Sequence, residues 1–140
     1  MTAPPDKLSI ILFDGAFDRV HYGLATASAA LAIGRAVTLF FTMGACRALL
    51  AGEGWRTMPV SSRDIDASSL DSRFAERGTA GFEELLSACA ALGAKMMVCE
   101  MGLRAMGIGT AELRDDLTYE EGGLVTFLED ASKDGAMLFI

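Results

Sequence analysis

The sequence of 140 residues is poor in the groups on which many catalytic and metal sites depend. It contains one histidine, one tryptophan, three cysteines and three prolines. A single histidine excludes catalysis by a histidine pair within one chain. The cysteines have no cysteine or histidine partners at zinc-ligand spacing. We therefore expect no metal and no cofactor, and three free thiols of the kind found in a reducing compartment.

Positive charge and long apolar runs are also scarce. Twelve lysines and arginines face 19 aspartates and glutamates, which gives a formal net charge of −7. This balance argues against nucleic acid as a partner. No apolar run reaches the roughly 18–20 residues of a membrane-spanning helix, and residues 1–7 lack the basic-then-apolar order of a signal peptide. These absences predict a cytoplasmic protein that acts on small molecules or protein partners.

Apolar residues, by contrast, are abundant. They make up 51% of the chain, whereas charged residues make up 22%. A chain of this length fits one domain, and small domains have much surface for their volume. Part of the apolar excess is therefore expected between subunits. We predict a single-domain homo-oligomer.

Short apolar runs alternate with helical periodicity along the chain. The runs predict buried strands over residues 7–13, 36–42, 94–99 and 136–140. The periodicity predicts helices over residues 18–34, with Asp18 as the cap, and over 45–51, 79–92, 100–106 and 124–134. This alternation is typical of an α/β fold with a parallel sheet between helices. Residues 53–78 are polar, and we expect a long insertion with room for a short helix, acting as a lid or a partner contact.

The candidate site lies at the carboxyl ends of the predicted strands, where open parallel sheets bind ligands. The first strand ends at Asp14-Gly15, the second at Thr42-Met43-Gly44 and the third at Cys99-Glu100. Cys99 also precedes a predicted helix, whose unpaired N–H groups favour a thiolate, while the charge of Glu100 opposes it. Cys99 is therefore the candidate reactive thiol. The alternative is a buried structural cysteine.

The remaining cysteines, the histidine and the acidic pairs have positions that favour a functional role less than that of Cys99. Cys46 follows the second predicted strand and is a candidate second thiol, whereas Cys89 lies on the core face of its helix and is expected to be structural. His21 is expected to be a partly exposed helix histidine with a satisfied hydrogen bond. The acidic pairs at 115–116 and 120–121 are interpreted as surface carboxylates.

Several motifs resemble those of the DsrE/DsrF-like family, and together they cover essentially the whole chain. They are Phe40-Phe41-Thr42-x-Gly44, Leu92-Gly93-Ala94…Cys99-Glu100-Met101, Met106-Gly107-Ile108 and Gly122-Gly123-Leu124. The subgroup most similar is an uncharacterised one often called peroxiredoxin-family. The resemblance implies a three-layer α/β/α sandwich with a mostly parallel sheet of about five strands, commonly assembled as a homo-oligomer. It also implies that Cys99 occupies the characteristic cysteine position, where sulfur-relay members carry a persulfide.

The leading hypothesis is a sulfur carrier, or sulfurtransferase-like protein, that holds a persulfide on Cys99. It would exchange sulfur with donor and acceptor proteins or small thiols. The pocket residues predicted with it are Asp14, Gly15, Thr42, Gly44, Cys46, Glu100, Met101, Gly122 and Gly123. Two alternatives stay open: a non-catalytic oligomeric module that binds a small ligand or a partner, and a thiol peroxidase. The peroxidase is disfavoured because Met96-Met97-Val98 precedes Cys99, in place of the Thr-x-x-Cys setting of peroxiredoxins.

Overall fold

The computed structural model describes residues 3–140, so the first two residues of the predicted polar N-terminus lie outside the described part. The strands are β1 (Lys7–Leu12), β2 (Ala36–Phe41), β3 (Lys95–Cys99), β4 (Glu120–Gly122) and β5 (Ala136–Phe139). The α-helices are α1 (Phe17–Ala32), α2 (Ala67–Glu76), α3 (Phe82–Ala91), α4 (Glu100–Met106) and α5 (Leu124–Asp130). Short 3₁₀ helices cover Met43–Leu49, Gly54–Thr57 and Thr110–Glu112. Within residues 3–140, no helix has the length and apolar character that crossing a membrane requires.

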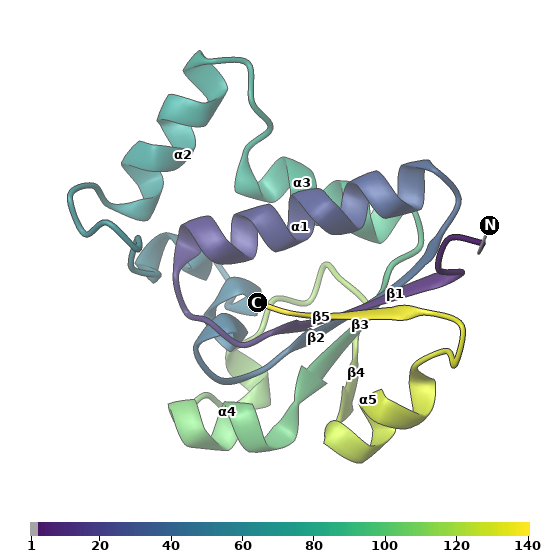
Figure 1. Ribbon diagram of the computed structural model, residues 1–140. Coiled ribbons are helices and arrows are strands. Elements are labelled where there is room, and N and C mark those ends of the chain that lie inside the picture. The colour runs from purple at the N-terminus through teal and green to yellow at the C-terminus, as the bar shows by residue number, and fades with distance from the viewer. Residues whose placement is uncertain (1–2) are drawn as a thin grey trace.

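The strands form one five-stranded sheet in the order β4-β3-β2-β1-β5, and every neighbouring pair is parallel. Helices α1, α2 and α3 lie on one side of this sheet, and α4 and α5 lie on the other (Figure 1). The predicted α/β/α class is therefore confirmed. Because all strands run the same way, the segments that follow them meet at one edge of the sheet.

The edge strand β4 was not predicted from its residues. Its Glu120 pairs with Met97 and its Gly122 pairs with Cys99, so it extends the sheet beyond β3. The strand is three residues long and only Gly122 is buried, so it lacks the apolar run that marks a strand in sequence. The expected interpretation of Glu120 and Glu121 as surface carboxylates holds for their side chains, which are exposed. The helix expected up to residue 134 ends earlier, at Asp130.

Two other local predictions were wrong in detail. The helix expected over 45–51 is a 3₁₀ helix that starts at Met43, whose φ of 48° is left-handed. Asp18 does not cap α1; the cap residue is Ala16, and the Asp18 carboxylate accepts a hydrogen bond from the Ser61 amide at 2.9 Å. The segment 53–78, by contrast, contains a short helix, for which the sequence left room. This helix is α2, whose cap residue Asp66 accepts a hydrogen bond from the Ser69 amide at 2.7 Å.

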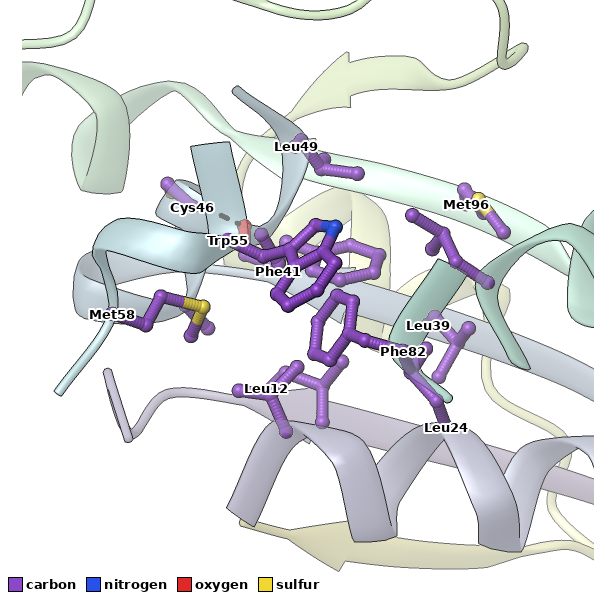
Figure 2. Packing of buried hydrophobic residues seen from close by; sticks show 14 of the residues in the cluster. Leu12, Leu24, Leu39, Phe41, Cys46, Leu49, Trp55, Met58, Phe82 and Met96 are labelled. Carbon is purple, nitrogen blue, oxygen red and sulfur yellow. Dashed lines mark hydrogen bonds between the residues drawn. The ribbon is translucent and has the colours of Figure 1, made fainter. Parts of the chain in front are cut away.

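The main core lies between the sheet and helices α1 and α3 (Figure 2). Its aromatic centre is Trp55, which is fully buried and stacks on Phe82 with ring centroids 5.0 Å apart. Full burial of a large apolar side chain stabilises a fold by about 1.5–3 kcal/mol. Burial of Trp55 therefore holds the beginning of the segment 53–78 against the core.

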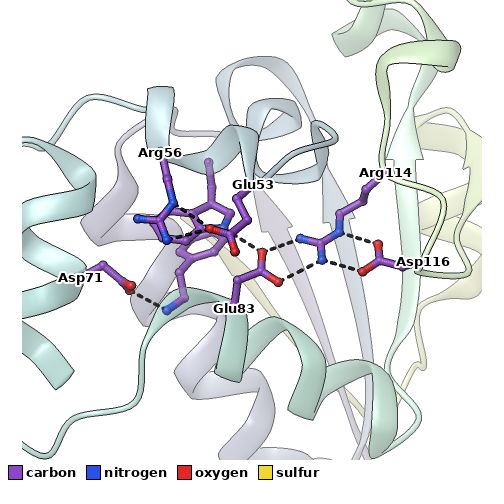
Figure 3. A network of polar contacts seen from close by, with 8 residues as sticks. Glu53, Arg56, Asp71, Glu83, Arg114 and Asp116 are labelled. Carbon is purple, nitrogen blue, oxygen red and sulfur yellow. Dashed lines mark hydrogen bonds and ion pairs between the residues drawn. The ribbon is translucent and has the colours of Figure 1, made fainter.

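An ion-pair network joins the chain between α4 and β4 to this core (Figure 3). Both terminal nitrogens of Arg114 donate to the Glu83 carboxylate, at 2.6 and 2.9 Å, and its Nε donates to Asp116 at 2.7 Å. Glu83 also accepts from the indole nitrogen of Trp55 at 2.8 Å. The hydrogen bonds from Arg114 lower the pKa of Glu83, so this carboxylate stays charged.

The opposite face of the sheet is covered by α5, which is attached at two points. Phe127 is fully buried and stacks on Phe40 at 4.8 Å. Asp130 accepts hydrogen bonds from Lys7 at 2.7 Å, from Lys95 at 2.8 Å and from Thr38 at 2.6 Å. Burial alone would raise the pKa of Asp130, but these three donors hold it well below its usual range.

Candidate functional site

Cys99 ends β3 and caps α4. Its sulfur accepts a hydrogen bond from the Gly102 amide at 3.3 Å, so the thiol takes the place that a serine or aspartate oxygen often holds at a helix start. The residue is 1% exposed. It belongs to a small cluster with Phe40, Met97 and Phe127 on the face that α5 covers.

The neighbouring strands place Thr42 and Gly122 on either side of Cys99. Gly122 is its partner in β4, and the β2–β3 register, which pairs Phe41 with Val98, brings Thr42 next to it on the other side. A Cβ added at Gly102 would lie 2.5 Å from the Met43 nitrogen and 2.8 Å from the Thr42 hydroxyl. The absence of a side chain at Gly102 therefore lets α4 lie directly against the end of β2.

The ends of β1 and β2 also touch. A Cβ added at Gly44 would lie 2.7 Å from the Cα of Gly15, so the two backbones are in direct contact. Asp14 turns back on its own loop, accepting from the Ala16 amide at 2.8 Å, and its other oxygen lies 3.6 Å from Arg19. The predicted residues Gly15, Thr42, Gly44 and Gly122 thus lie with Cys99 at one edge of the sheet, and Asp14 faces a hollow of about 320 Å³ whose lining does not include Cys99.

The other two thiols are held inside the main core. Cys46 donates to the Phe41 carbonyl at 3.8 Å (Figure 2), and burial, followed by the charge of Cys99, raises its pKa to about 12. Cys89 donates to the Leu24 carbonyl at 3.4 Å, and burial raises its pKa to about 11. Both are therefore protonated at neutral pH. Cys46 belongs to the main core, whereas Cys99 belongs to the small cluster on the other face of the sheet.

The remaining predicted residues surround the start of α4 and the start of α5. Glu100 is exposed and lines a hollow of about 240 Å³ on α4, and Met101 is nearly half exposed. Gly123 is the cap residue of α5. His21 was expected to be partly exposed and is instead buried, with Nε2 2.9 Å from the Ala80 carbonyl oxygen, on the α1 side of the sheet. Its hydrogen bond was expected.

Sequence reasoning missed the residues that enclose Cys99. Phe127 and Gly102 each lay in a predicted helix, and neither was assigned to the site. A glycine three residues after a candidate cysteine is a usable signal for close backbone approach. Among residues 3–140, no group of three or more histidine, cysteine, aspartate or glutamate side chains is placed to hold a metal ion.

Comparison with known proteins agrees with this arrangement. The sequence model of the DsrE/DsrF/DrsH-like family matches residues 55–139, more than half of the chain. The chain belongs to this family. This DsrE-like chain is 26% identical to the uncharacterised protein YrkE of Bacillus subtilis (strain 168), over the full length of both proteins. It is 24% identical to the sulfur carrier protein DsrE2 of Allochromatium vinosum, over 96% of this chain and 98% of that protein.

Solved structures match the DsrE-like chain over nearly its whole length. The YchN protein of E. coli superposes with a TM-score of 0.64 at 19% identity, covering 96% of this chain and 99% of its own. MTH1491 of Methanobacterium thermoautotrophicum, a protein of unknown function, superposes with a TM-score of 0.58 at 13% identity, with coverages of 96% and 98%. These structures support the fold. The family and the relative named as a sulfur carrier support membership of a sulfur-relay family.

Proposed function

We propose that this chain is a sulfur carrier that holds its cargo as a persulfide on Cys99. The single observation that carries the proposal is the position of Cys99 in a member of a sulfur-relay family. Its sulfur lies at the carboxyl edge of the parallel sheet and receives a backbone N–H at 3.3 Å. A backbone donor at the sulfur stabilises an anionic form, thiolate or persulfide, without a nearby cation.

The proposed reaction moves one neutral sulfur atom and needs no external oxidant. The Cys99 thiolate attacks the outer sulfur of a donor persulfide, R–S–SH. The new bond forms between the Cys99 sulfur and that outer sulfur while the S–S bond of the donor breaks, and the donor leaves as the thiolate R–S⁻. Delivery is the same exchange, with an acceptor thiolate attacking the outer sulfur on Cys99 and Cys99 leaving as a thiolate.

The other thiols are poorer candidates for this step, because a thiolate rather than a thiol is the nucleophile. The pKa values of Cys46 and Cys89, about 12 and about 11, leave very little thiolate at neutral pH. Each also donates its hydrogen bond to a backbone carbonyl, which favours the protonated form. Both features favour Cys99 as the carrier residue.

Intact-protein mass spectrometry after incubation with cysteine persulfide tests the proposal. The wild type should gain the mass of one sulfur atom, and dithiothreitol should remove it. Cys99→Ser should abolish the gain, whereas the matched variants Cys46→Ser and Cys89→Ser should retain it. Full loading of Cys99→Ser, or no loading of the wild type, would contradict the carrier function.

Exposed apolar side chains support a further part of the proposal, assembly of the chain into a homo-oligomer. The rings of Phe13 and Phe139 pack against each other in a tilted arrangement with centroids 5.4 Å apart, and Phe139 is 68% exposed. Met137 of β5 and Leu124 and Leu128 of α5 are also exposed. Side chains of this kind are typical of surfaces that meet a partner. Light scattering at low micromolar concentration should give a mass above that of one chain, and a monomer would contradict the assembly.

The same exposed apolar side chains give the non-catalytic binding module its specific support. That function becomes the preferred one if cysteine persulfide leaves all three thiols unmodified while the oligomer forms. The persulfide experiment and the light-scattering experiment together therefore separate the two functions.

A further inference from the structure

A sulfur donor cannot reach Cys99 in the structure as described, because the residue is almost completely buried. The surface hollows near the carboxyl edge of the sheet are lined by other residues, among them Asp14 and Glu100. Sulfur exchange at Cys99 therefore requires a local movement of whatever covers it. We propose that Phe127 on α5 is that cover, and that it selects by size which sulfur compounds reach Cys99. The selection of donors rests on the carrier function proposed above.

The packing around the thiol identifies Phe127. Three members of the buried cluster, Phe40, Met97 and Cys99, come from the neighbouring strands β2 and β3 and stand on one face of the sheet. Side chains on a sheet face are covered from above by the element that packs on them. Phe127 is the fourth member and the one that a helix supplies, with its ring stacked on Phe40 at 4.8 Å.

The attachment of α5 is uneven along its length. Its last residue, Asp130, is bound by hydrogen bonds to three strands, at the end of the helix far from Cys99. Its first turn follows Gly122-Gly123, and no side chain caps it. Leu124 and Val125 in that turn are exposed, so they contribute little burial. The end of α5 next to β4 and Cys99 is therefore the end that opens at the lower free-energy cost.

The wall above Cys99 is apolar and aromatic, and it is closed. A slender sulfur group needs a small displacement of the Phe127 ring, whereas a bulky group needs the whole first turn of α5 to lift. Phe127 thus favours donors that carry their sulfane sulfur on a small group, such as low-molecular-weight persulfides. It disfavours donors in which the group that carries the persulfide is a ring or a branched chain.

Two thiol-reactive compounds that share the same reactive group and differ in size test whether Phe127 selects by size. Methyl and benzyl methanethiosulfonate react identically: the cysteine thiolate attacks the sulfur that carries the methyl or benzyl group, a mixed disulfide forms and methanesulfinate leaves. Peptide mapping by mass spectrometry gives the rate at each cysteine, and Cys89 in the core reports global unfolding. We compare the wild type with Phe127→Ala, Phe127→Leu and, as the matched control, Phe74→Ala, which removes an aromatic ring on the other side of the sheet.

In the wild type, Cys99 should react more slowly with the benzyl reagent than with the methyl reagent. Phe127→Ala should speed the benzyl reaction at Cys99 by about tenfold or more and bring the two rates together, since local opening is no longer limited by the ring. Phe127→Leu should give an intermediate ratio of the two rates. Phe74→Ala should leave the ratio at its wild-type value, and Cys89 should stay slow throughout.

An unchanged ratio in Phe127→Ala would overturn the proposal. If that variant unfolds, which acceleration of Cys89 would reveal, Phe127→Leu decides, and a wild-type ratio in a folded Phe127→Leu overturns it equally. These rates do not depend on sulfur loading. Failure of the wild type to accept sulfur would refute the carrier function, and a change in the size ratio in that case would leave Phe127 as the cover of the thiol.

Discussion

Removal of the Asp130 carboxylate charge should weaken the attachment of α5 to the sheet. Its two oxygens accept from two lysines and a threonine on three different strands, and the Asp130 side chain is 12% exposed. Hydrogen bonds to a charged group each stabilise a fold by about 1.5–3 kcal/mol when they are shielded from water. Lys95 is 41% exposed, so its contribution is discounted, and most of the effect comes from Lys7 and Thr38. We expect Asp130→Asn to lower the free energy of unfolding by about 2–3 kcal/mol at neutral pH.

The pH dependence of this loss has a defined sign. The pKa of Asp130 is depressed in the folded state, so its contribution is fully present above the unfolded-state pKa of about 3.9 and declines as the pH falls towards the folded-state value. Urea unfolding at about pH 7 and about pH 3 should therefore give a larger difference between wild type and Asp130→Asn at the higher pH. Glu129→Gln, which removes the same charge from the exposed neighbouring residue, should have little effect. An Asp130→Asn variant as stable as Glu129→Gln, or a difference that grows in acid, would refute the reasoning.

Two further substitutions probe the contacts that hold the site edge together. Gly102→Ala places a Cβ 2.5 Å from the Met43 nitrogen, so α4 is forced away from the end of β2, and we expect the free energy of unfolding in urea to fall by about 1–3 kcal/mol. If the Gly102→Ala variant unfolds at the same urea concentration as the wild type, α4 can move away from the end of β2 without loss of stability. Arg114→Met removes the partner of Glu83 and should cost about 1–3 kcal/mol. The fluorescence of Trp55, the one tryptophan of the chain, should change in this variant because its indole donates to the same Glu83 carboxylate. An unchanged spectrum and an unchanged stability would show that Arg114 does not hold Glu83 in place.

The elements that were predictable from sequence are those whose burial leaves a periodic pattern. The β3 strand and α4 meet at Cys99-Glu100 as expected, because an apolar run there changes to helical spacing at a single residue and Gly107 closes the helix. The parallel arrangement followed from alternation of such runs with helices. In contrast, β4 is held by pairing with β3 and not by its own apolar content, so nothing local distinguishes Glu120–Gly122 from a loop.

The position of the candidate site could be predicted from the sequence, but the residues that surround Cys99 could not. Strand ends identify the edge at which Gly15, Gly44 and Cys99 gather, since parallel strands bring their carboxyl ends together. The backbone contact between Gly15 and Gly44, and the cover of Cys99 by Phe127, arise between segments that are distant in sequence. Which helix packs on which face depends on the path of every crossover, and that path is a property of the whole sheet.

The order of the strands also constrains when the protein can complete its fold. Strand β1 pairs with β2, which follows it closely, but its other edge is filled by β5, where Leu8 meets Ala136 and Ile11 meets Phe139. During synthesis, β1, β2 and β3 leave the ribosome with that edge of β1 unpaired until residues 136–139 have been made. Contacts of such long sequence separation form late and slowly. The nascent chain therefore exposes an apolar strand edge until β5 pairs with β1, and this interval is when chaperone binding would most affect the yield of folded protein.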